Sequence, residues 1–81
     1  MNRTTEELGY LFIFSVCAAV QFINEERPPL AKRALHKAKK YSDLQLFQRC
    51  EENKLPAPSP KIAKEIFKRT LYQTVHAIIA Q

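Results

Sequence analysis

Glycine is nearly absent from this 81-residue chain, which has one glycine and no tryptophan. Turn-rich β-sandwiches and barrels need glycine at their tight turns, and phosphate-binding loops need it where the backbone approaches a phosphate. The sequence therefore excludes both. With 46% hydrophobic and 26% charged residues, it has the composition of a globular protein rather than of a disordered chain. The length leaves room for a single helical domain, over residues 1–81.

Cysteine is also scarce, with two residues in the chain, Cys17 and Cys50. They form neither a C-x-x-C motif nor a zinc-binding spacing, and two thiols are too few for a disulfide framework. We expect both thiols to be reduced and partly buried, as is usual in a cytoplasmic protein. The chain has no H-x-x-x-H pair and no cluster of histidine and cysteine, so it predicts no metal site and no cofactor.

The sequence contains no recognisable catalytic grouping. His36 stands among lysines and His76 lies near the C-terminus, and no local motif brings either to a nucleophile. Adjacent glutamates such as Glu6 and Glu7 point about 100° apart on a helix, so they do not face each other as paired carboxylates. We therefore expect no catalytic residues and no enzymatic activity.

A long apolar run, from Leu8 to Ile23, contains only Ser15 and Gln21 as clearly polar residues. It is shorter than the roughly 20 residues of a membrane helix, and the glutamates at its ends do not fit a signal peptide. We expect a core helix and no membrane association, with a membrane segment as the alternative. This helix should be buried over most of its circumference. Its predicted core residues are Leu11, Phe12, Val16 and Ala19.

Periodicity and capping residues predict a compact all-α bundle of three to four helices, over about 4–26, 28–41, 43–53 and 60–80. Thr4 begins a capping box with Glu7, and Ser59 precedes a proline that suits a first helical turn. A short proline-rich linker is expected at 55–60. The last helix should pack through Ile66, Phe67, Leu71, Val75 and Ile78.

A second capping box, formed by Ser42 and Gln45, predicts that a new helix begins after Ser42. This third helix should bury its apolar residues. They are Leu44, Leu46, Phe47 and Cys50.

Positive charge is concentrated in residues 28–41, which carry five lysines and arginines and no acid, in a chain of net charge +5. Such a helix either attracts nucleic-acid phosphates, attracts an acidic protein surface, or is simply solvated. Basic residues of the last helix could extend the same surface. The predicted basic surface comprises Lys32, Arg33, His36, Lys37, Lys39, Lys40, Lys64, Lys68 and Arg69.

A second apolar stripe on the first helix lies opposite its expected core face. A helix that is apolar nearly all round is either central to its fold or meets another chain. Aromatic and amide groups together are typical of interface centres, so this stripe is the predicted partner or dimer interface. Its residues are Tyr10, Phe14, Cys17 and Gln21.

These patterns predict a small, non-catalytic cytoplasmic protein that binds and regulates or inhibits a larger protein partner, and that forms a homodimer. The alternative is a nucleic-acid-binding accessory protein that uses the basic face of helix 28–41.

Overall fold

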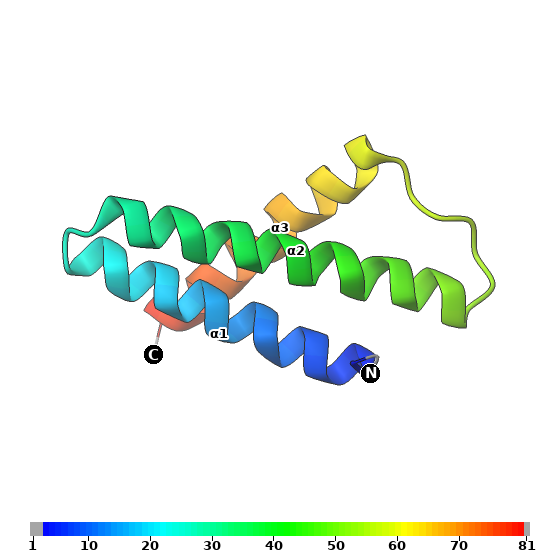
Figure 1. The fold of residues 1–81 in the computed structure, drawn as a ribbon, viewed down its shortest axis with the longest axis horizontal. Helices are drawn as coiled ribbons and strands as arrows, with labels where there is room; N and C mark the ends of the chain where they lie inside the picture. Colours follow the sequence, from blue (N-terminus) through cyan, green and yellow to red (C-terminus); the bar gives the residue numbers. More distant parts are fainter. Residues whose placement is uncertain (1–2, 81) are drawn as a thin grey trace.

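The computed structural model describes residues 3–80 of the chain, which form three helices (Figure 1). Helix α1 spans Thr5–Asn24, α2 spans Pro28–Glu52 and α3 spans Pro60–Ile79. The first two lie side by side as an antiparallel hairpin, and α3 crosses this pair obliquely (Figure 1). The predicted all-α bundle is confirmed, with three helices.

The N-termini of α1 and α3 follow from capping chemistry. The Glu7 amide donates to Thr4 Oγ1 at 3.1 Å, and the Thr4 amide donates to the Glu7 carboxylate at 3.4 Å, which completes the capping box. Before α3, the Ile62 amide donates to Ser59 Oγ at 3.3 Å, and Pro60 takes the first helical position. Both helix starts are therefore where the sequence predicted them.

Removing either cap should lower the free energy of unfolding by about 1 kcal/mol, because an N-terminal amide loses its acceptor. Chemical denaturation followed by circular dichroism would measure this for Thr4→Ala and Ser59→Ala. Thr4→Ser keeps the oxygen and is the control. Equal stability of Thr4→Ala and Thr4→Ser would show that the cap contributes nothing.

Helix α2 differs from the prediction, because it is a single helix of 25 residues that runs through Ser42. Ser42 is only 8% exposed and continues a buried line of small residues against α1, made of Ala31, Ala34 and Ala38. The next residue, Asp43, accepts from Lys39 Nζ at 2.9 Å, one helical turn back. The prediction of separate helices over 28–41 and 43–53 is wrong, since this packing continues across the local capping motif.

The core is small and lies where the three helices meet. Phe12 and Val16 of α1 and Ala38 of α2 form its buried centre. The rings of Phe12 and Phe67 lie 6.3 Å apart in an edge-to-face arrangement, a favourable geometry for aromatic pairs. The partly buried residues packed around this centre are Tyr41, Phe67, Leu71, Val75 and Ile78.

The small residues of α2 and the single glycine of α1 allow the two helices to approach closely. An added Cβ at Gly9 would lie 2.9 Å from the Nε2 atom of Gln45, whose amide donates to the Thr5 carbonyl at 3.1 Å. Gly9 thus leaves room for a side chain that links the two helices.

Helix α1 is less buried than the sequence predicted. Its buried residues are Leu8, Phe12, Val16 and Ala19, all on one side. The expectation of burial over most of the circumference is wrong, because α2 and the oblique α3 cover only that side, and Leu11 is half-buried. By length and composition alone α1 could cross a membrane, and only 28% of its most apolar 18-residue window is buried.

Two further expectations about burial need correction. Ile66 of α3 is 37% exposed and lies outside the core margin, whereas the other predicted contact residues of α3 pack against it. Cys17 is exposed rather than partly buried, while Cys50 is half-buried. Neither cysteine forms a disulfide.

Candidate interaction surfaces

The predicted interface stripe of α1 lies on the solvent side of the helix. Tyr10 is 54% exposed and Phe14 is 65% exposed, and the neighbouring Ile13 is 43% exposed. Spacings of three and four residues bring these side chains to one face. We call this surface the α1 strip. It consists of Tyr10, Ile13, Phe14, Cys17 and Gln21.

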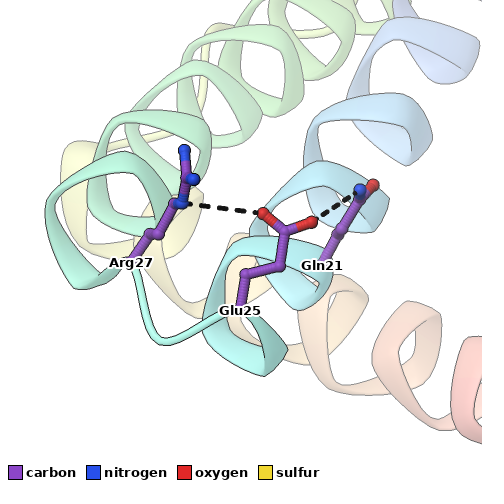
Figure 2. A network of polar contacts seen from close by, with 3 residues as sticks. All are labelled: Gln21, Glu25 and Arg27. Carbon is purple, nitrogen blue, oxygen red and sulfur yellow. Dashed lines mark hydrogen bonds and ion pairs between the residues drawn. The ribbon is translucent and has the colours of Figure 1, made fainter.

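Gln21 ends the α1 strip and takes part in a polar network at the turn between α1 and α2 (Figure 2). Its Nε2 donates to Glu25 at 3.0 Å, and the other oxygen of Glu25 lies 3.9 Å from Nε of Arg27. These side chains are exposed, so the ion pair adds little stability. The network gives both carboxylate oxygens of Glu25 a partner at the turn before the basic segment of α2.

The predicted basic residues of α2 border different hollows of the molecule. Arg33 and Lys37 line a hollow between α1 and α2, whereas Lys32, His36 and Lys39 line a second hollow between α2 and α3. At about 100° per residue, these two sets of residues lie on opposite sides of the buried alanine line. The remaining predicted basic residues are exposed, one on α2 and three on α3. They are Lys40, Lys64, Lys68 and Arg69.

The hollow between α1 and α2 has a volume of about 390 Å³ and includes no residue of α3. Its walls are apolar on both helices, and Arg33 and Lys37 add the positive charge. Within residues 3–80, neither of these two has an ion-pair partner. The apolar and small wall residues are Phe14, Ser15, Ala18, Phe22, Leu30 and Ala34.

The C-terminal half of α2 carries an apolar and acidic surface that sequence reasoning missed. Leu44 is 44% exposed and Phe47 is 42% exposed, although both were expected to be buried. Together with Gln48, Glu51 and Glu52 they line a depression of about 470 Å³. In one continuous helix, the spacings of three and four residues between Leu44, Phe47 and Glu51 place them on the same side as Lys40 and Arg33. The predicted break at Ser42 prevented this grouping.

The two histidines lie on different helices. His36 borders the hollow between α2 and α3, and His76 stacks on Tyr72, with ring centres 6.2 Å apart. Among residues 3–80, no group of three or more histidine, cysteine, aspartate or glutamate side chains is placed to hold a metal ion.

Comparison with known proteins found no family model, no curated protein and no solved structure that matches this chain.

Proposed function

We propose that this chain is a small, non-catalytic cytoplasmic protein that binds a larger protein partner through the α1 strip and regulates or inhibits it. The observation that carries the proposal is the exposure of Tyr10 and Phe14, 54% and 65%, on a helix whose other side forms the core. Large contiguous apolar patches are rare on the surfaces of soluble monomers and mark interaction sites. Exposed aromatic residues are also the side chains that carry most binding energy in interfaces.

The rigid support of the α1 strip favours the same function. Phe12 and Val16, on the inner side of α1, are 4% and 0% exposed and hold the helix against α2 and α3. A strip presented on a packed helix loses little conformational entropy when a partner binds. The α1 strip is therefore suited to serve as a preformed docking surface.

Nucleic-acid binding by α2 is the second candidate function. The observation in its favour is that Arg33, Lys37 and Lys40 are exposed, without an ion-pair partner in the part of the chain that the structure describes. Phosphate contacts by such residues release counterions and depend steeply on salt. Arg33 and Lys37 border the hollow toward α1, however, whereas Lys32 borders the hollow toward α3, and this separation makes a single phosphate-binding surface less favourable.

Capture from a cell extract tests the proposed function with three forms of the protein. Wild type should retain a stoichiometric partner, and a Tyr10→Ser/Phe14→Ser variant should retain at least about tenfold less, because aromatic anchors dominate interface energies. Tyr72→Ser is the matched control, since Tyr72 is 71% exposed but lies on α3. Circular dichroism should show equal helix content in all three forms.

Equal recovery by the strip variant and wild type would contradict the proposal. Two further assays use the purified protein with a generic DNA duplex and with anionic lipid vesicles. Tight duplex binding at physiological salt, lost in Lys37→Glu/Lys40→Glu, would promote the nucleic-acid function. Vesicle binding that is lost in the strip variant would instead assign α1 to a membrane surface.

A further inference from the structure

We infer that a second copy of this chain docks antiparallel on the outer side of α2, about a two-fold axis near position 42. The residues of this surface are spaced alternately four and three apart, so they share one side of the helix. All of them are exposed. We call this surface the α2 face, and it comprises Arg33, Lys37, Lys40, Leu44, Phe47 and Glu51. None of these six residues belongs to the α1 strip, so the inference goes beyond the proposed function.

The two ends of the α2 face carry opposite charges. Arg33, Lys37 and Lys40 occupy its N-terminal half, while Glu51 lies at its C-terminal end. Within residues 3–80, neither Arg33 nor Glu51 forms an ion pair in its own chain. An antiparallel copy brings each Arg33 to the Glu51 of the other copy, so both charges gain a partner.

The spacing of these residues is symmetric about position 42. Arg33 and Glu51 each lie nine residues from it. Lys37 and Phe47 each lie five residues away, and Lys40 and Leu44 each lie two. In an antiparallel pair with two-fold symmetry, residues at equal distances from the axis face each other.

The facing pairs are chemically compatible. Lys37 meets an aromatic ring, on which its methylene stem and its ammonium group can both rest. Lys40 meets Leu44 through its apolar stem. The register that joins Arg33 to Glu51 thus leaves no pair of like charges opposed among the residues of the α2 face.

The shape of the surface supports the same register. The hollow of about 390 Å³ between α1 and α2 lies beside Lys37 and is walled by Phe14, Ala18 and Leu30. Phe47 of the second copy, which faces Lys37, is placed to enter this hollow. The hollow is too open to enclose a small ligand on most sides, since its wall residue Phe14 is 65% exposed. An aromatic side chain of a second copy is therefore the better occupant.

The length of the α2 face indicates a weak dimer. At about 1.5 Å per residue, Arg33 and Glu51 lie about 27 Å apart along α2. This contact is short, and small interfaces give weak complexes. We therefore expect a dissociation constant on the order of micromolar or weaker.

Charge reversal tests the inference through the mass of the protein in sedimentation equilibrium. Arg33→Glu and Glu51→Arg should each raise the dimer dissociation constant by at least about tenfold, because two attractive contacts per dimer become repulsive. An equimolar mixture of the two variants should dimerise like wild type. In the mixed dimer, both contacts between positions 33 and 51 again join opposite charges.

Two control variants separate this interface from other surfaces. Arg69→Glu makes the same charge change as Arg33→Glu, but at an exposed position of α3. Tyr10→Ala/Cys17→Ser alters the α1 strip without touching the hollow. Both should dimerise within about twofold of wild type, since substitutions away from an interface are nearly neutral. Circular dichroism should confirm that every variant is folded.

Three outcomes would overturn the inference. The first is a wild-type protein that stays monomeric up to about 1 mM, near the weak limit of specific binding. The second is a dimer dissociation constant that stays unchanged in both Arg33→Glu and Glu51→Arg, or that does not return to the wild-type value when the two variants are mixed. The third is loss of the dimer in Tyr10→Ala/Cys17→Ser, which would place the interface on α1. The capture experiment detects a different protein partner, and Tyr10→Ala/Cys17→Ser spares Phe14, the one residue of the α1 strip that also walls the hollow. Failure of the proposed function and failure of this inference are therefore distinguishable.

Discussion

Replacing Phe12 with alanine is expected to lower the free energy of unfolding by about 3–5 kcal/mol. Phe12 is 4% exposed, packs edge-on against Phe67 and adjoins Val16 and Ala38. Removing the ring loses these contacts and leaves a cavity between the three helices. Small domains have about 5–15 kcal/mol of stability in total, so this loss should leave the variant close to unfolding.

Thermal and urea denaturation followed by circular dichroism would measure the effect. Phe14→Ala is the matched control, because it removes the same ring two positions along the helix, where the side chain is 65% exposed. Below the dimerisation range, it should change the stability by no more than about 0.5 kcal/mol. A Phe12→Ala variant that melts like wild type would show that the core assignment is wrong.

The contrast between Phe12 and Phe14 shows how far the sequence could predict α1. Spacings of three and four residues correctly placed Phe12, Val16 and Ala19 on the core side. The extent of burial could not be predicted, because it depends on the path of α3 across the hairpin. That path brings Phe67 onto Phe12 but leaves Tyr10 uncovered, and no local pattern in either helix encodes it.

The prediction of α2 failed for a different physical reason. A capping box is a signal of four residues, and Ser42 with Gln45 satisfies it. Burial of Ala38 and Ser42 against α1 favours an unbroken helix instead, and Gln45 donates to the Thr5 carbonyl rather than capping a new helix. Tertiary packing commonly overrides local signals of this size.

The candidate surfaces were only partly predictable. The exposure of Tyr10 and Phe14 agrees with a free stripe on α1, although their role in binding stays a prediction. The separation of Arg33 from Lys32 into different hollows required knowing where α3 lies. The predicted break at Ser42 assigned Glu51 and Arg33 to different helices, so the sequence did not predict that they share the α2 face.

A proline at position 43 is expected to lower the free energy of unfolding by about 3 kcal/mol or more. In the continuous α2, residue 43 lies in the helix interior, so proline would lose an amide hydrogen bond and clash with the Lys39 carbonyl. If Ser42 instead capped a new helix, position 43 would be the first helical residue. Proline is favoured there, and Asp43→Pro would be as stable as wild type.

Asp43→Ala is the control for loss of the carboxylate. It removes the contact to Lys39, a partly exposed ion pair worth less than about 1 kcal/mol, and one buried carboxylate oxygen that has no partner in the described chain. Denaturation of the two variants by urea would therefore isolate the effect of the proline ring. Because a break at position 43 would also move Glu51 out of line with Arg33, Asp43→Pro should abolish the dimer as well. Full stability of Asp43→Pro would contradict both the continuous α2 and the α2 face built on it.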